Sequence, residues 1–349
     1  MAHNTAEEAS VGLLTSNEIH TGFISGATFT NKPVQYAVVD GLAIFEGCIV
    51  LGTAEEMARK TAAVRAGEDY QGDAGQLGDL GTVVNGVVIS GDQYRWTNAT
   101  VPYDIDPSLP NQNRVSDAIA HWEANTNIRF VRRTSSNASQ YPNYVYFKPA
   151  TGCWSYVGMR GNKQDIGLAN GCSMGNTIHE IGHALGLWHE QSREDRDEHV
   201  IIHWENIESG KESNFNQHIT DGDDIGPYDY GSIMHYGSHA FSKNGRPTIT
   251  TIPEGILIGQ RNGLSQNDIN TIHTVYTTWH YNMVVGRTYA THDSQNAWAH
   301  INTIGWRKIK TGSADGVTNM YIAFCEAAAN NYRVHVYMDG SAIYRMELV

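Results

Sequence analysis

The chain has 349 residues, of which 40% are hydrophobic and 17% are charged, so it is long enough for two or three globular domains. Its net charge of −13 argues against nucleic acid or an anionic membrane surface as the main partner. No apolar run approaches the ~18 residues of a membrane-spanning helix, and the first ten residues, MAHNTAEEAS, lack the basic and apolar segments of a signal peptide. We therefore expect either that a signal has been removed or that export needs none.

The first part of the chain is predicted to form short strands and one helix. Residues 19–52 alternate loosely between apolar and polar and are broken by Gly and Asn-Lys-Pro, which is typical of short strands. A helix is expected over 53–67, because Thr53 can cap it, Glu56 can complete a capping box and Gly67 can end it. Six of the twenty residues 67–86 are glycine, which predicts a linker after a leading segment of about 86 residues.

The remaining elements follow from periodicity. Apolar residues recur at helical spacing in RVSDAIAHWEANTN (114–127), IRFVRR and NYVYFKP are typical of strands, and a helix is expected within GNTIHEIGHALGLWHE. Ser265 can cap another helix, over 265–276. Near the end, two alternating runs joined by Asp339-Gly340 predict a hairpin, so 279–349 is expected to be a small β-rich domain.

The stretch HEIGHALGLWH contains the candidate metal ligands and the candidate catalytic residue. His179 and His183 are four residues apart and therefore share one face of a helix, where two neutral imidazoles can bind one Zn²⁺. Gly186 can turn the chain sharply and return His189 as a third ligand. Three protein ligands leave one position open for water, which is typical of a catalytic site, and Glu180 is placed to take a proton from that water.

This stretch matches the metzincin signature His-Glu-x-x-His-x-x-Gly-x-x-His, and beyond it the chain resembles the astacin family. The resemblance covers about residues 87–278. It is carried by EQSREDRD (190–197) after the third histidine, by YDYGSIMHY (228–236), which resembles the family's Met-turn with Met234, by the closing segment 258–276, and by GDQYRW (91–96), which resembles the start of the mature enzyme.

The resemblance implies an α+β fold in which a two-lobed catalytic domain over 87–278, with a twisted sheet and a zinc-binding helix, follows a propeptide over 1–86. It implies one catalytic Zn²⁺, a secreted zinc endopeptidase acting on protein or peptide substrates, and a tyrosine, Tyr236, that ligates zinc, swings away and can hydrogen-bond the oxyanion. It also implies cleavage at Gly86–Val87, after which the new amine pairs through water with Glu190. We expect a monomer without a membrane span.

The cysteines are few, and two of them lie close together. Cys153 and Cys172 could form a disulfide worth ~3 kcal/mol, or they could be two reduced buried thiols. The resemblance favours the disulfide, because the pair matches one of the two that astacins usually carry. The second family disulfide has no counterpart, since no cysteine occurs over 173–278. The two lobes of the catalytic domain that the resemblance implies would then be held together by packing alone.

Cys48, in AIFEGCIVLG (43–52), has no nearby partner. Astacin propeptides resemble this stretch but carry an aspartate that binds the zinc where this chain has Cys48. Thiolate also suits zinc. We therefore expect Cys48 to act as a cysteine switch that keeps the propeptide on the metal, with Phe45 and Ile49 packed in or beside the cleft. A disulfide to Cys325 and an inert buried thiol remain alternatives.

Two further alternatives concern function. The chain could be a catalytically silent binding module on a protease fold, which zinc content and casein cleavage would reveal. In the last domain, four aromatic residues could form a carbohydrate-binding or other surface-binding face, or they could fill a small core, which we favour. These residues are Trp298, Trp306, Tyr332 and Tyr337.

Overall fold

The computed structural model describes residues 12–25, 30–67, 86–218, 222–291, 296–302, 304–310, 314–338 and 342–349. The chain divides into two compact units, Met1–Trp96 with Val101–Ile272 and Thr97–Thr100 with His273–Val349. The predicted linker lies outside the described residues except at its two ends. Within the described ranges, no helix is both long and apolar enough to cross a membrane.

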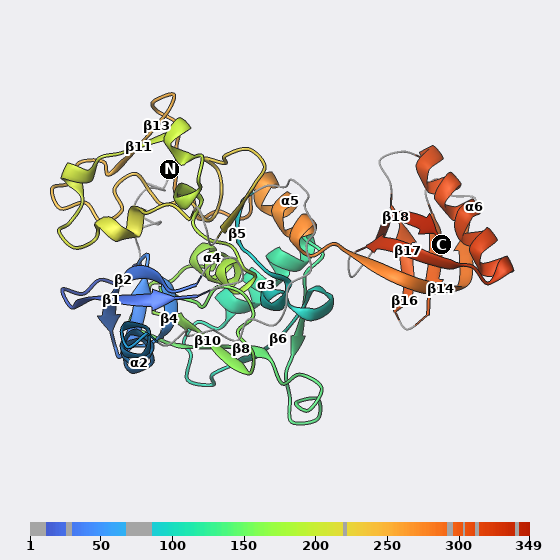
Figure 1. Ribbon diagram of the computed structural model, residues 1–349, viewed down its shortest axis with the longest axis horizontal. Coiled ribbons are helices and arrows are strands. Elements are labelled where there is room, and N and C mark those ends of the chain that lie inside the picture. Colours follow the sequence, from blue (N-terminus) through green and yellow to red (C-terminus); the bar gives the residue numbers. More distant parts are fainter. Residues whose placement is uncertain are drawn as a thin grey trace. The chain divides into compact units, whose positions relative to one another are not determined.

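The leading segment forms a four-stranded antiparallel sheet with one helix packed against it (Figure 1). The strands follow chain order: β1 (Ile19–Ile24), β2 (Lys32–Val39), β3 (Leu42–Phe45) and β4 (Ile49–Thr53). The helix α2 (Ala54–Arg65) begins at the predicted capping box, in which the Thr53 hydroxyl accepts from the Glu56 backbone amide and the Glu56 carboxylate accepts from the Thr53 amide. This part of the sequence reading is confirmed.

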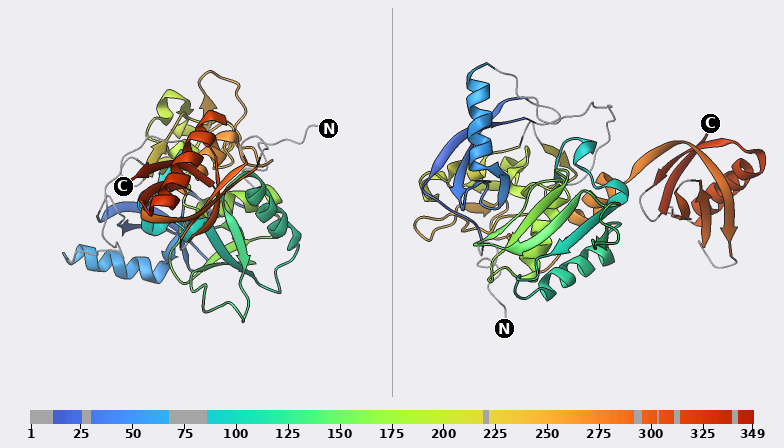
Figure 2. Two further views of the ribbon diagram at one scale, coloured as in Figure 1. Left: turned by 90° about the vertical axis from the view of Figure 1, so that its right-hand side faces the viewer. Right: turned by 90° about the horizontal axis from the view of Figure 1, so that it is seen from below.

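A second, five-stranded sheet has the strand order β7-β6-β8-β10-β9 (Figures 1 and 2). Its strands are β6 (Thr100–Ile105), β7 (Arg129–Arg132), β8 (Tyr144–Pro149), β9 (Cys153–Trp154) and β10 (Lys163–Leu168). The helices α3 (Asn113–Asn125) and α4 (Met174–Ala184) pack against each other, and α4 also packs against β9 and β10. The short strand β9 is therefore an edge that lies close to α4.

The rest of the first unit is less regular. Two small antiparallel pairs join β5 (Gly86–Ile89) to β12 (Gly222–Ile225) and β11 (Val200–Ile202) to β13 (Ile249–Thr251). Helix α5 (Gln266–Val275) is capped as predicted, because the Ser265 hydroxyl accepts from the Asp268 amide at 2.9 Å. Short 3₁₀ helices of this unit occupy Asp92–Tyr94, Glu190–Ser192, Arg196–Glu198, Trp204–Asn206 and Glu212–Phe215, and one more, Thr97–Ala99, belongs to the second unit.

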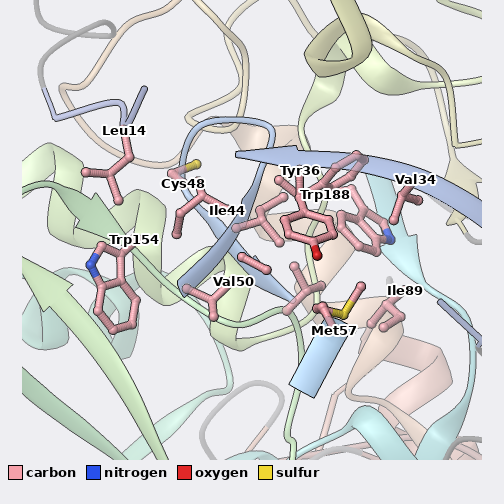
Figure 3. Close-up of a cluster of buried hydrophobic side chains, with 14 residues drawn as sticks. Leu14, Val34, Tyr36, Ile44, Cys48, Val50, Met57, Ile89, Trp154 and Trp188 are labelled. Carbon is pink, nitrogen blue, oxygen red and sulfur yellow. The ribbon is translucent and has the colours of Figure 1, made fainter. Parts of the chain in front are cut away.

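The leading segment and the zinc-motif region share one hydrophobic cluster (Figure 3). Tyr36, Met57 and Cys48 come from the leading segment, and Trp154 and Trp188 come from the region after the linker. Because one cluster includes both, the leading segment is packed as part of the first unit.

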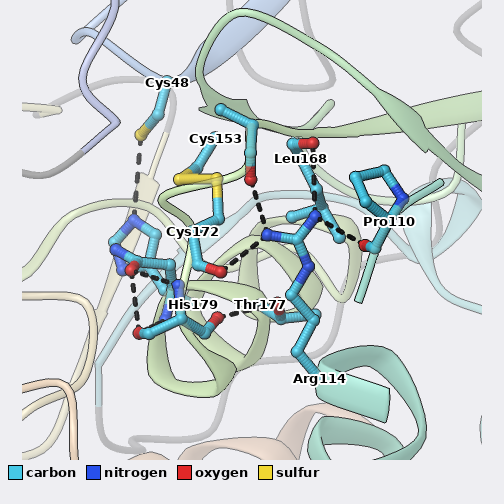
Figure 4. The surroundings of a disulfide bond; sticks show 11 residues. Cys48, Pro110, Arg114, Cys153, Leu168, Cys172, Thr177 and His179 are labelled. Carbon is cyan, nitrogen blue, oxygen red and sulfur yellow. Dashed lines mark hydrogen bonds between the residues drawn. A yellow bond between two sulfur atoms is a disulfide. The ribbon is translucent and has the colours of Figure 1, made fainter. Parts of the chain in front are cut away.

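Cys153 and Cys172 form the expected disulfide (Figure 4). The buried guanidinium of Arg114 donates to the backbone oxygen of Cys172 at 2.7 Å and to those of Pro110 and Leu168 at 3.3 and 3.4 Å. These bonds tie helix α3 to the disulfide loop.

The second unit is a closed five-stranded barrel with one helix. Its elements are β14 (Thr278–Ala290), β15 (Ala297–Ile301), β16 (Gly305–Ile309), α6 (Ala314–Asn330), β17 (Arg333–Met338) and β18 (Ala342–Leu348). The strand order is β14-β15-β16-β18-β17, with β16 and β18 parallel, and the helix lies between the third and fourth strands. This is the arrangement of an OB-fold. The predicted hairpin is confirmed by the antiparallel pairing of β17 with β18.

The barrel core corrects one interpretation of the sequence. Its buried side chains are aliphatic apart from Phe324, and none of the four aromatic residues considered for it belongs to it. Trp306 is 43% exposed and Tyr332 is 46% exposed, so the prediction that these residues fill the core is wrong. Cys325 is only half-buried, with its sulfur 3.2 Å from the Thr288 hydroxyl, and neither it nor Cys48 is in a disulfide.

Candidate functional site

Helix α4 positions the first two histidines of the motif. The helix is capped by the Ser173 hydroxyl and is buried from Gly175 to Ala184. It ends at Leu185, and Gly186 follows with φ of 107°, a conformation that only glycine adopts at little cost. The chain can therefore reverse at this point and bring His189 back toward His179 and His183, as the sequence predicted.

The structure places Cys48 against these three histidines, although 131 residues separate it from the nearest of them in sequence. The Cys48 sulfur lies 3.7, 3.4 and 3.2 Å from Nε2 of His179, His183 and His189, in that order. All four side chains are buried, and their four potential ligand atoms lie within 4.8 Å of one another. Figure 4 shows the Cys48 sulfur pointing at the His179 ring.

The hydrogen bonds of the outer ring nitrogens fix the tautomers. His179 Nδ1 lies 2.8 Å from the Ile233 backbone oxygen, and His183 Nδ1 lies 2.8 Å from that of Leu187. A carbonyl oxygen only accepts, so both Nδ1 atoms carry the proton and both Nε2 atoms present lone pairs. Those two Nε2 atoms are only 3.1 Å apart. Two lone pairs at this distance repel unless a cation lies between them.

The cluster fits zinc. A tetrahedral zinc with bonds of ~2.0–2.1 Å to nitrogen and ~2.3 Å to sulfur sets the nitrogens about 3.4 Å apart and places the sulfur about 3.6 Å from each nitrogen. The separations above agree with these values to within a few tenths of an ångström. Burial and the carboxylates of Glu180 and Glu46 raise the pKa of the Cys48 thiol well above its ordinary value, and a bound metal ion would act in the opposite direction, because its charge favours the thiolate.

The third histidine has a different partner, Glu46, which the sequence does not predict. His189 Nδ1 lies 2.7 Å from a carboxylate oxygen of Glu46, the residue two before Cys48. The other carboxylate oxygen accepts from the Ser192 hydroxyl at 3.1 Å and lies 2.9 Å from His218 Nε2. Burial alone would raise the pKa of Glu46, but His218 and the hydrogen bonds from His189 and His218 lower it to about 2. Glu46 is therefore an ionised, fully buried group.

A tight loop presents Cys48 to the histidines. The hairpin of β3 and β4 closes through three residues, of which Glu46 and Gly47 have φ of 48° and 71°. The backbone after this turn is bound to Ser155. The Cys48 backbone oxygen accepts from the Ser155 amide, and the Val50 amide donates to the Ser155 backbone oxygen, both at 2.9 Å. Ser155 follows the edge strand β9. The loop thus adds its backbone to a sheet edge, as an extended peptide does in β-strand addition.

Glu180 is buried, and its Oε2 has no hydrogen-bond partner among the described residues. Burial raises the pKa of this carboxyl well above its ordinary value, and the positive charge of Arg261 acts in the opposite direction. A buried, unpaired carboxyl next to the first histidine suits the proton-transfer role that the sequence suggested.

Tyr236 and Met234 also lie at the site. The sulfur of Met234 would be 2.7 Å from a Cβ added at Gly182, so the methionine fits beneath the zinc helix only because residue 182 is glycine. The Tyr236 ring lies 4.6 Å from the His189 ring, between centroids, and its hydroxyl donates to the Glu46 backbone oxygen at 2.7 Å. In this form the hydroxyl is thus bound to the leading segment.

Glu190 is buried beside the site, where its Oε1 accepts from the Asp229 amide at 2.9 Å and lies 3.8 Å from Arg193 Nε. Burial raises the pKa of Glu190 to about 8, in spite of Arg193. The expected cleavage bond, Gly86–Val87, lies within strand β5. The roles expected for both remain predictions.

Comparisons with known proteins identify the family of the chain. The family model for the astacin peptidases matches residues 88–277, which is more than half of the chain. Protein SpAN of Strongylocentrotus purpuratus is 43% identical over 196 residues, covering 53% of this chain and 32% of that protein. Zinc metalloproteinase nas-13 of Caenorhabditis elegans is 40% identical over 212 residues, covering 59% of this chain and 46% of that protein. The chain thus spans about a third to a half of the length of these relatives.

Among solved structures, high choriolytic enzyme 1, a hatching enzyme zinc-protease of Oryzias latipes, is 40% identical with a TM-score of 0.47, covering 52% of this chain and 92% of that one. The family match extends from strand β5 to the end of α5 and contains all three histidines, Glu180 and the Met-turn. The chain therefore belongs to the astacin family of peptidases, whose members use one catalytic zinc ion.

Proposed function

We propose that the chain is the zymogen of a secreted zinc endopeptidase, in which the leading segment, residues 1–86, is a propeptide held on the metal by Cys48. The observation that carries this proposal is the convergence of one propeptide sulfur and three histidine nitrogens on a single buried point. With zinc bound by the three histidines, the Cys48 sulfur would take the position that a catalytic zinc keeps open for water. A propeptide bound in this way excludes both the water and the substrate.

Removal of the propeptide would free the groups that catalysis needs. A zinc ion bound by the three histidines supplies a polarised carbonyl and an activated water. Glu180, whose carboxyl has an unpaired oxygen here, takes the proton of that water and returns it to the leaving amine. The Tyr236 hydroxyl, released from the Glu46 backbone oxygen, becomes able to donate to the oxyanion of the substrate.

The substrate would take the backbone position that the propeptide now occupies. Ser155 exchanges two hydrogen bonds with residues 48 and 50, so the edge after β9 can bind an extended peptide in the same way. We propose protein or peptide substrates on this basis. The disulfide between Cys153 and Cys172 supports an oxidising compartment and hence an extracellular location. We further propose that the enzyme acts as a monomer.

Maturation is proposed to create a new N-terminus near Val87 whose amine pairs, through water, with Glu190. A buried carboxyl with a raised pKa favours a cationic partner when one becomes available. No Lys or Arg lies between Arg65 and Arg95, so an enzyme that cleaves after small or aliphatic residues must make this end. N-terminal sequencing of the active form tests this, and full activity with a start at residue 66 would contradict it.

The role of Cys48 in holding the propeptide on the metal is tested by Cys48→Ala in the full chain. Cys325→Ala is the matched control, because Cys48 and Cys325 are the two free cysteines. Cys48→Ala should give early self-cleavage or peptidase activity in the proprotein, and a thiol-reactive mercurial should activate the wild type. Cys325→Ala should stay latent. The role of Cys48 would be refuted by a Cys48→Ala proprotein as latent as the wild type, or by a mass spectrum showing Cys48 bridged to Cys325. Either result would leave the assignment as a zinc peptidase unchanged.

A further inference from the structure

The outer face of the barrel carries an ordered set of side chains that the peptidase mechanism does not use. Each of three neighbouring strands, β14, β15 and β16, presents one aromatic and one basic residue two positions apart, which places both on the same face of the sheet. These pairs are Arg287 with Tyr289, Trp298 with His300, and Trp306 with Lys308.

The strand register aligns these pairs in two rows. Tyr289 lies opposite Trp298, and Trp298 lies opposite Lys308. Arg287 lies opposite His300, and His300 lies opposite Trp306, with the two rings of this last pair 5.4 Å apart in an edge-to-face arrangement. The six side chains therefore form one continuous surface, which we call the aromatic–basic face.

This face is exposed within the second unit. Tyr289 is 52% exposed and Trp306 is 43% exposed, while the alternate residues of β15, such as Ala299 and Ile301, are buried in the barrel core. The Trp298 indole nitrogen donates to the Asn296 side chain at 2.9 Å, which fixes the orientation of that ring. Large aromatic surfaces held at fixed angles and left in solvent are typical of binding sites.

The charge of the face is positive in an acidic protein. Strands β14, β15 and β16 contain no Asp or Glu. Residues 273–349 carry six Lys or Arg and five Asp or Glu, a net charge of +1, whereas the whole chain carries −13. The face therefore complements an anionic ligand, and its aromatic residues complement flat rings within that ligand.

We propose that the aromatic–basic face binds an acidic polysaccharide, one whose sugar rings stack on the aromatic residues and whose carboxylates pair with Arg287 and Lys308. The face over the second and third strands of an OB-fold, here β15 and β16, is a general site for oligosaccharides and oligonucleotides. With two permanent cations against three aromatic rings, this face has more stacking surface than charge, and it falls short of the six to ten phosphate contacts of a protein that binds duplex DNA with a steep salt dependence. The disulfide in the same chain also supports a compartment outside the cell.

The probe is a hexamer of galacturonic acid, titrated into the full-length zymogen carrying Glu180→Ala so that no self-cleavage occurs. Trp306→Ala should weaken binding about tenfold, the effect of one lost stacking contact. Lys308→Gln should weaken it several-fold and reduce its sensitivity to salt. The matched controls, Tyr332→Ala and Arg345→Gln, remove an exposed aromatic and an exposed cation elsewhere on the barrel and should leave binding unchanged.

Several outcomes would overturn the proposal. They are no binding of the hexamer, equal binding of neutral chitohexaose, or equal losses in the control variants. Tighter binding of single-stranded oligothymidylate, lost in the same variants, would assign the face to nucleic acid instead. Lys308→Gln keeps the proposal testable if Trp306→Ala disturbs the barrel, as circular dichroism would show.

Discussion

Glu46 offers a sharp test of how the proposed propeptide is held on the site, because its side chain does not occupy the metal position itself. Its carboxylate binds three groups of the region after the linker: the His189 ring, the Ser192 hydroxyl and the His218 ring. We therefore consider the change Glu46→Ala, which leaves Cys48 in place and removes only this second attachment.

The structure sets the size of the effect. A hydrogen bond to a charged group is worth about 1.5–3 kcal/mol, so three of them give at least about 4.5 kcal/mol before compensation. Water entering the emptied space would restore part of this. We expect a net loss of about 3 kcal/mol, which raises the population of the open propeptide by about 10²-fold.

The assay measures two rates on the purified, zinc-loaded full chain: initial cleavage of a fluorogenic peptide, and loss of the propeptide by mass spectrometry. Both should rise about 10²-fold in Glu46→Ala. Glu55→Ala is the matched control, because Glu55 is an exposed carboxylate on helix α2 of the same segment.

An internal control comes from maturation itself. Once the propeptide is lost, the variant and the wild type are the same protein, so their kcat/KM values must agree. If Glu46→Ala stays within about twofold of the wild type in both rates while Cys48→Ala is active, the carboxylate fills space without holding the propeptide, and the reasoning from its hydrogen bonds is wrong.

Three further predictions concern single residues. Glu180→Ala should keep its zinc but lose 10²–10⁴-fold or more in turnover of the mature enzyme, and retention of more than about a tenth of the activity would contradict its role. The Gly47→Ala proprotein should show peptidase activity, since its Cβ would lie 2.6 Å from the Phe241 ring. The control Gly41→Ala, which has a similar φ of 78° and open space around it, should stay latent. Peptide cleavage by both proproteins decides this. Because the pKa of Glu190 is raised to about 8, the folded proprotein binds the extra proton between about pH 4.5 and 8, so its free energy of unfolding should fall as pH rises through that range. Glu190→Gln should flatten this slope in urea titrations, and parallel curves for the two proteins would refute the assignment.

The local part of the site was predictable from sequence, because helical spacing and a glycine stop determine how His179, His183 and His189 can meet. The lone cysteine was predictable from the resemblance of its surroundings to an astacin propeptide. Glu46 was not predicted, since its partners lie 143 to 172 residues away and nothing in its neighbourhood marks it. Two adjacent residues with positive φ in a hairpin loop are visible only in the structure.

The barrel shows a different limit of sequence reading. Helix α6 has apolar residues at helical spacing, including Val317, Met320, Tyr321 and Phe324, and the prediction of a small β-rich domain does not include it. The prediction that the aromatic residues fill the core fails because alternation alone does not say which face of a strand is inside. The register of β14, β15 and β16 settles that question, and it places Trp306 outside.

Strand β5 has a consequence for the order of events in activation. Its four residues pair with β12 on one side, and on the other the Ile89 amide donates to the Gly186 oxygen, in the turn that ends the zinc helix. A protease needs an unpaired, extended stretch of chain, so the proposed cleavage at Gly86–Val87 requires this strand to open first. The rate of cleavage there should follow the opening equilibrium rather than the concentration of protease alone. We therefore expect a first cut upstream of Gly86 and slower trimming to the final end, with intermediates that carry a short N-terminal extension.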